Sequence, residues 1–191
     1  MFKLKIKKIA ILTYEQFKNN ADIIKDIGED YWLATKTEAT GDKKIEIKQN
    51  PYLCGPYMPK TYFKHVFLSN VLYFSADRRT DPNAFGLWNG EPGVYHGGHD
   101  VREECGIRPV LYIEDANHLK PGTQIFIQDK PYTVLNNGLI LADFIIATSI
   151  YNYKKGMNNY KNSIVKKYIM AWSSVNFAPD YIVDAREQGE D

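Results

Sequence analysis

The residues best suited to chemistry form a short run near the middle of the chain, where two histidines flank two glycines. The run reads His96-Gly97-Gly98-His99-Asp100, and it is followed by Glu103, Glu104 and Cys105. Imidazole, carboxylate and thiolate groups bind zinc and other transition metals, and the glycines would allow a loop to turn both histidines inward. A metal-dependent enzyme would therefore use His96, His99 and Cys105. The spacing matches no established metal motif, and a polar surface loop explains it better, so we predict no metal and no other cofactor.

Other patterns typical of catalysis do not occur in the sequence. It contains no Gly-x-Ser-x-Gly nucleophile turn, no phosphate-binding P-loop and no Gly-x-Gly-x-x-Gly dinucleotide motif. The two cysteines, Cys54 and Cys105, are too few for a disulfide framework, which fits a reducing compartment. One disulfide between them remains an alternative. We therefore predict a protein that is not an enzyme.

Aromatic side chains are the feature that points most directly to recognition. Aromatics make up 14% of the residues, with fourteen tyrosines, and many fall in predicted loops. These loop aromatics are Tyr52, Tyr57, Tyr62, Trp88, Tyr95, Tyr151, Tyr153 and Tyr160. Tyr and Trp offer large, rigid contact areas at low entropic cost, which is typical of binding surfaces. The same rings could instead fix the loops of the fold to its core, and the sequence does not separate the two alternatives.

Basic residues near some of these aromatics suggest a second kind of surface. Arg78, Arg79 and Arg102 could combine with neighbouring aromatics to bind single-stranded nucleic acid. They could equally form a solvated face, paired with nearby acidic residues. The formal net charge of +1 gives no general attraction to nucleic acid or to an anionic membrane, so we predict neither as a partner.

The size and hydropathy of the chain favour one soluble domain. A length of 191 residues allows one sizeable core, so we expect a single domain over residues 1–179 and an acidic, frayed tail over 180–191. The N-terminus interleaves lysines with apolar residues, unlike a signal peptide, and no span approaches the roughly 18 apolar residues of a membrane helix. We predict a cytoplasmic protein, and the sequence does not indicate its oligomeric state.

Alternation and capping patterns predict the first elements. Residues 2–8 alternate apolar residues with lysines, as in a half-buried edge strand with a charged outer face. Thr13-Tyr14-Glu15-Gln16 is a capping box, which predicts a helix from there to Ile27, ended by Gly28. Short strands are then expected at residues 31–35, 45–48, 71–75, 94–96 and 107–113, separated by long polar stretches at 50–59 and 78–105.

The second part of the chain reads as a β-meander followed by a helix. Strands are expected at residues 124–128, 132–136, 139–141 and 144–147, with a tight turn at Asn137-Gly138, where both residues accept positive φ. A helix is expected at residues 163–172, with Ile164, Tyr168 and Trp172 on one face, Val165 and Ile169 beside it, and Lys166 and Lys167 pointing outward.

Several of these segments carry short motifs that resemble an uncharacterised domain family of bacteria and their phages. The motifs are Tyr31-Trp32-Leu33-Ala34-Thr35, Gly106-Ile107-Arg108-Pro109-Val110-Leu111, Gly122-Thr123-Gln124-Ile125-Phe126-Ile127, Pro131-Tyr132-Thr133-Val134-Leu135 and Asn162-Ser163-Ile164-Val165. The family is related to C-type-lectin-like and formylglycine-generating-enzyme-like folds. Here its two halves stand in swapped order, with the closing half at residues 28–115 and the opening half at 120–172. In C-type-lectin-like domains the first and last strands lie side by side, which suits circular permutation.

The resemblance implies an α+β, C-type-lectin-like fold: a mainly antiparallel twisted sheet with two helices and long irregular loops. In such folds the long loops before the closing strand form the variable ligand surface, which corresponds here to residues 78–100. We therefore predict a binding module that recognises another protein. The predicted binding residues are Arg78, Arg79, Phe85, Trp88, Tyr95 and Arg102. An inhibitor of a host system carried by a phage or mobile element is consistent with this prediction.

The resemblance also raises two other functions, carbohydrate binding and oxidase chemistry, and implies a role for Arg108. A carbohydrate-binding domain is the second alternative, although only Asp81-Pro82-Asn83 and Glu91-Pro92-Gly93 come close to the calcium-binding Glu-Pro-Asn pattern. Formylglycine-generating enzymes use a closely spaced pair of cysteines, which this chain lacks, so copper-thiolate oxidase chemistry is not expected. In the resembling family the Arg-Pro pair opens a core strand, so Arg108 is expected to be paired and to hold a neighbouring loop.

Overall fold

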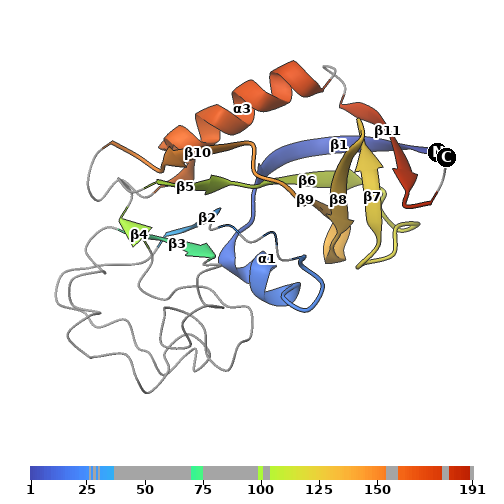
Figure 1. The fold of residues 1–191 in the computed structure, drawn as a ribbon, viewed down its shortest axis with the longest axis horizontal. Helices are drawn as coiled ribbons and strands as arrows, with labels where there is room; N and C mark the ends of the chain where they lie inside the picture. The colour runs from blue at the N-terminus through green and yellow to red at the C-terminus, as the bar shows by residue number, and fades with distance from the viewer. Residues whose placement is uncertain are drawn as a thin grey trace.

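The structure is a computed structural model that describes residues 1–25, 27, 29, 31–36, 70–74, 99–100, 104–153, 159–177 and 181–189. Within these residues the fold is mixed α+β, with two sheets and two α-helices (Figure 1). Strands dominate, and all but one of the strand pairs are antiparallel. The predicted α+β class is therefore confirmed.

The larger sheet closes into a six-stranded barrel in the order β1-β11-β7-β8-β9-β6. Its strands are β1 (Phe2–Ile11), β6 (Pro109–Glu114), β7 (Gln124–Ile127), β8 (Lys130–Val134), β9 (Leu139–Ala142) and β11 (Ile182–Glu187). The expectation of an edge strand at the N-terminus was wrong, because β1 pairs with β11 on one side and with β6 on the other. The expectation of a frayed tail was also wrong, because residues 182–187 form the strand that closes the barrel.

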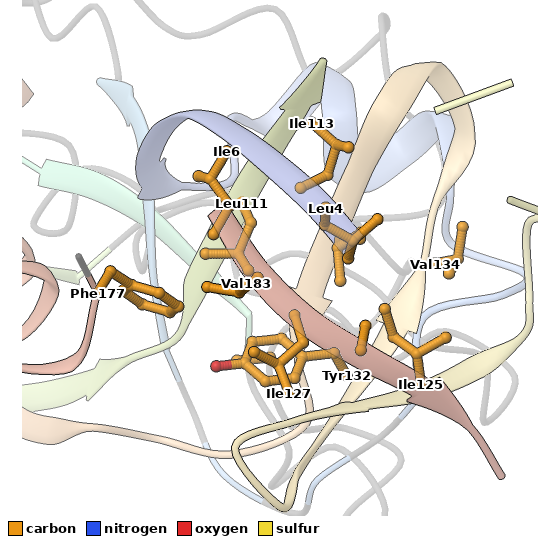
Figure 2. Close-up of a cluster of buried hydrophobic side chains, with 13 residues drawn as sticks. Leu4, Ile6, Leu111, Ile113, Ile125, Ile127, Tyr132, Val134, Phe177 and Val183 are labelled. Atoms are coloured by element: carbon orange, nitrogen blue, oxygen red, sulfur yellow. The ribbon is translucent and has the colours of Figure 1, made fainter. Parts of the chain in front are cut away.

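The barrel interior is filled by apolar side chains from all six strands, as Figure 2 shows. Leu4 and Ile6 of β1 point inward, while Lys3 and Lys5 are exposed, as the alternating pattern predicts. Phe177 adds its ring to the same cluster from the segment after the last helix. Because burying each aliphatic side chain contributes about 1.5–3 kcal/mol, this cluster is a main source of stability.

The smaller sheet has five strands in the order β10-β5-β2-β3-β4. Its strands are β2 (Tyr31–Lys36), β3 (Asn70–Phe74), β4 (His99–Asp100), β5 (Glu104–Ile107) and β10 (Ala147–Ile150). The expected strand at 107–113 is in fact two strands, because the chain passes from β5 in this sheet to β6 in the barrel at Arg108. The expected fourth strand of the meander begins later, at Ala147, and pairs with β5 instead of extending the barrel.

The first helix, α1 (Tyr14–Asn19), begins as predicted and ends early. Both hydrogen bonds of the capping box between Thr13 and Gln16 are present. The predicted end at Ile27 was wrong. Asn20 leaves the helix because its side chain donates to the Gln16 carbonyl oxygen at 2.8 Å and accepts from the Asn136 backbone N–H at 2.8 Å.

The other α-helix that the structure describes, α3 (Ile164–Asn176), runs alongside β1 and β10 (Figure 1). Ser163 caps it by accepting a hydrogen bond from the Lys166 backbone N–H. Its buried residues are Val165, Ile169 and Ser173, whereas Tyr168 is 43% exposed. The predicted helix is therefore confirmed. The expectation that Tyr168 lies on its buried face was wrong.

Two of the expected strands, at residues 45–48 and 94–96, lie outside the described residues, as does the polar stretch at 50–59. Among the helices that the structure describes, none is both long enough and apolar enough to span a membrane.

Candidate functional site

The segment predicted to bind a partner, residues 78–100, follows one strand of the smaller sheet in the sequence and ends in the neighbouring strand. Arg78, Arg79, Phe85, Trp88 and Tyr95 all lie outside the described residues, as do His96 and Arg102. The structure does place β3, which precedes all of these residues in the sequence, and β4, which follows all of them except Arg102. β3 ends at Phe74 and β4 begins at His99, and the two strands are antiparallel neighbours in which Val71 faces His99.

The strand next to β3 is held firmly in the core. β2 pairs with β3 through Tyr31 opposite Phe74 and Trp32 opposite Tyr73. Tyr31 and Trp32 are buried, and the Trp32 indole N–H donates to the Ser149 carbonyl oxygen at 2.8 Å. Because a buried indole N–H needs a partner, this bond fixes the orientation of the ring as well as its burial. The strand β3, which precedes the predicted binding segment, thus pairs with a strand whose side chains at Tyr31 and Trp32 are buried in the core.

A buried arginine joins the two sheets immediately beside β2. Arg108 is 1% exposed, and its Nε donates to the Ala142 carbonyl oxygen at 2.5 Å. Its Nη1 donates to the Tyr31 hydroxyl at 3.2 Å, and its Nη2 donates to the Lys25 carbonyl oxygen at 3.0 Å. The same Nη2 pairs with the Asp143 carboxylate at 3.2 Å. Arg108 is therefore paired and holds the loop after α1, as its position in the Arg-Pro motif predicts.

The carboxylate of Asp143 is held from the barrel side. The Thr133 hydroxyl donates to both of its oxygens at 2.9 Å, and the Gln124 amide donates to one of them at 3.1 Å. The side chain of Asp143 is 2% exposed, so the ion pair with Arg108 is shielded from solvent. Sequence reasoning missed Asp143, Thr133 and Gln124, because no short motif links them to Arg108. Their role in the structure is to hold Arg108, and through it the connection between the barrel and β2.

The topology does not bring the candidate metal ligands together. His99 lies in β4 and Cys105 lies in β5, and β2 and β3 stand between these strands. Three strand spacings of roughly 4.8 Å place the two residues about 14 Å apart across the sheet, too far for one metal ion. Cys105 is also buried, at 3% exposure. Among the described residues, no three His, Cys, Asp or Glu side chains form a group that could hold a metal ion.

The described tyrosines divide between the core and the surface. Tyr151 is completely buried and Tyr160 is partly buried, so neither ring offers a broad contact surface. Tyr153, by contrast, is 77% exposed. The alternative that some loop aromatics fix the fold is thus correct for Tyr151, while Tyr153 remains accessible to a partner. Sequence patterns alone could not make this distinction, because all three residues have similar neighbours along the chain.

Two of the lysines on the outer face of β1 form ion pairs. Lys5 pairs with Glu114 at 2.8 Å, and the hydrogen bond and charge of Lys5 lower the pKa of the Glu114 carboxyl below its usual value. Lys3 pairs with Asp184 at 3.2 Å. Exposed pairs of this kind contribute little to stability. They do, however, offset two of the positive charges along β1.

Comparison with known proteins found no match: the chain matches no protein-family model, no curated protein and no solved structure.

Proposed function

We propose that this chain is a non-enzymatic binding module that recognises another protein through residues 78–100. The observation that carries the proposal is the pairing of β3 with β4, which holds the last residues of this segment, His99 and Asp100, beside the strand that precedes it in the sequence. Binding residues are commonly found on loops that a rigid scaffold positions. The segment itself contains Phe85, Trp88 and Tyr95, which are residue types enriched where proteins bind one another.

We further propose that the fold is related to C-type-lectin-like domains. The pairing of the first and last strands supports this relationship, because Phe2 of β1 faces Ala185 of β11. The two helices and the mainly antiparallel sheets are also in agreement. We expected a single twisted, mainly antiparallel sheet, whereas the structure has a closed barrel and a second sheet. Under this proposal, residues 78–100 occupy the position of the ligand-binding loops.

Affinity capture with matched variants tests the function. The full chain, Trp88→Ala, Tyr95→Ala and the control Tyr153→Ala would be immobilised and exposed to extracts of the source organism and its host. Tyr153 is a suitable control because it is an exposed aromatic outside the proposed binding segment. We expect one protein in stoichiometric amount on the full chain and on Tyr153→Ala, reduced at least about tenfold on the other two, as for a binding hot spot. Circular dichroism would establish that all four proteins are folded.

Two other outcomes would contradict the proposal in different ways. Equal retention of the same protein by all four chains would place the binding surface outside residues 78–100. Retention of glycans in calcium, lost in the presence of chelator, would instead support the carbohydrate-binding alternative.

A further inference from the structure

The outer side of α3 carries more apolar surface than a helix that faces solvent normally does. The exposed side chains of α3 are Lys167, Tyr168, Met170, Ala171, Ser174 and Val175. Most of them are aromatic or aliphatic, and Met170 and Val175 are 60% and 83% exposed. The opposite side, with Val165 and Ile169, is already buried in the core. A helix that is apolar on both sides is typically covered on both, so the outer side is suited to a contact.

Part of this outer side repeats at the spacing of a coiled-coil seam. Four residues, here named the outer seam, follow one another at intervals of four, three and four positions: Ile164, Tyr168, Ala171 and Val175. At about 100° per residue, these intervals place all four within an arc of about 60°. The helix lies along the outside of the described fold, with β1 and β10 packed against its other side (Figure 1). A seam of this spacing is complementary to a second helix.

The outer seam is complementary to itself when a second copy of α3 runs antiparallel to the first. In that register Tyr168 of one copy lies opposite Ala171 of the other, and Ile164 lies opposite Val175. The largest side chain of the seam thus meets the smallest, which allows close packing of knobs into holes. In a parallel pair, Tyr168 would meet Tyr168 and Ala171 would meet Ala171, so one layer would be crowded and the next would be underpacked.

The charges of α3 also favour the antiparallel arrangement. Within the helix, Lys166 and Lys167 are the charged residues, and both lie in its first half. The N-terminal end of a helix carries partial positive charge, so its own dipole does not stabilise them. In an antiparallel pair, Lys167 instead lies beside the C-terminal half of the other helix, where the dipole is negative and Ser174 is the flanking side chain. In a parallel pair the two Lys167 side chains would lie at the same level and repel.

We propose that this chain forms a homodimer in which the outer seams of two α3 helices pack antiparallel. The contact is isologous, because the same surface serves both copies, so it closes as a dimer and does not extend into a filament. A helix of 13 residues is about 20 Å long, so the interface is small and the dimer dissociates on dilution. The proposal is independent of the protein-binding function proposed above, since α3 lies outside residues 78–100.

Sedimentation equilibrium over a series of concentrations tests the proposal. The full chain would be compared with Tyr168→Lys, Ala171→Lys and the control Met170→Lys, which is an exposed position of the same helix outside the seam. We expect the full chain and the control to pass from monomer to dimer over the same concentration range. The two seam variants should raise the dissociation constant at least about tenfold, because each places a further positive charge in a contact flanked by Lys167. Circular dichroism would establish that all four proteins are folded.

Disulfide trapping tests the orientation of the two helices. Ile164→Cys and Val175→Cys would be prepared separately in a Cys54→Ser background, since the other native cysteine, Cys105, is buried. These two positions face each other only in the antiparallel register. We therefore expect mild oxidation of the mixture to give a disulfide between the two variants, and either variant alone to give much less.

Three results would overturn the proposal. The first is a chain that stays monomeric at every concentration, and the second is equal dissociation constants for the seam variants and the control. The third is a disulfide that each cysteine variant forms only with itself, because this would mean a parallel pair. A monomer that binds anionic lipid vesicles, with binding lost in Tyr168→Lys, would assign the outer side of α3 to a membrane surface instead.

Discussion

The guanidinium of Arg108 is a charge that the fold can bury only because every side of it is occupied. Four acceptors surround it: the Tyr31 hydroxyl, the Asp143 carboxylate and the backbone oxygens of Lys25 and Ala142. Desolvating such a pair costs several kcal/mol per ion, so its net effect on stability depends on complete hydrogen bonding. The interactions that hold Arg108 also connect β2 to the barrel. We therefore regard it as a structural residue.

Removal of this charge should be costly, because Asp143 would remain buried without its partner. We expect Arg108→Met to lower the free energy of unfolding by about 3–5 kcal/mol, measured by urea denaturation. Arg186→Met is the matched control, since Arg186 pairs at 3.5 Å with Asp129, whose side chain is 92% exposed. The control should lose less than about 1 kcal/mol. Similar losses in the two variants would show that the buried pair has no special role in holding the sheets together.

The turn between β8 and β9 shows how a local backbone requirement determines an element. Asn137 and Gly138 have φ values of 61° and 72°, as the Asn-Gly pattern predicts. A Cβ atom added at Gly138 would lie 3.2 Å from the Ile113 carbonyl oxygen, whereas one at Gly122, with φ of 88°, would meet its nearest neighbour at 3.8 Å. The two glycines thus share the backbone conformation but differ in available space.

Alanine substitutions at these glycines should separate strain from steric contact. Gly122→Ala should destabilise by about 1–2 kcal/mol through the positive φ alone. Gly138→Ala should lower the free energy of unfolding by more than this, because the backbone oxygen of Ile113 cannot move without disturbing the hydrogen bonds between β6 and β1. Thermal unfolding of both variants would measure the difference. Equal costs would mean that the turn relaxes enough to accommodate the methyl group.

At the level of elements, the sequence was most reliable where the signal is local. The lysine alternation in β1, the capping box at Thr13 and the Asn137-Gly138 turn each depend on neighbouring residues, and all three are present. The stretch 107–113 was misread because a mainly apolar run, even with Arg108 near its start, looks the same whether it belongs to one strand or two. Only the long-range pairing of β5 with β10 and of β6 with β1 separates them at Arg108.

The same limit applies to the candidate site. The prediction that Arg108 is paired followed from the cost of burying a charge. Its partners could not be predicted, because they come from segments more than thirty positions away in the sequence. Tyr151 and Tyr153 are two positions apart, yet one is completely buried and the other is largely exposed. Their exposure depends on the packing of Trp32 against Tyr151, which no local pattern encodes. Predicted binding residues in segments 75–98 and 101–103 remain predictions.

For the whole molecule, closure of the barrel depends on β11, a strand that composition alone did not reveal. Its sequence alternates apolar and charged residues, and Val183 and Ala185 are buried while Asp184 and Glu187 are exposed. The acidic character of the last residues obscured this alternation. Because β11 pairs with both β1 and β7, it removes two open strand edges that would otherwise invite association.

The pairing of β1 with β11 also makes testable our proposal that the motifs stand in swapped order relative to the family they resemble. In an antiparallel pair, the start of β1 lies beside the end of β11, so a short Gly-Ser linker could join the two. In the family's order, β7 would be the first strand and β6 the last. These strands are not neighbours in the barrel, but the exposed turn that contains Lys120 and Pro121 lies on the short connection between them.

We expect a permuted chain that begins at Pro121, continues through a linker from 191 to 1 and ends at Lys120 to fold. New termini are tolerated at exposed turns whose backbone makes few hydrogen bonds. A second permutant opened between Tyr132 and Thr133 should not fold, because this break lies inside β8, at two buried positions that pair with β9. Near-ultraviolet circular dichroism and cooperative urea unfolding would report the outcome. Failure of the first permutant while the original chain folds would mean that the connection between β6 and β7 is required for barrel closure, and that the two motif orders cannot share one fold.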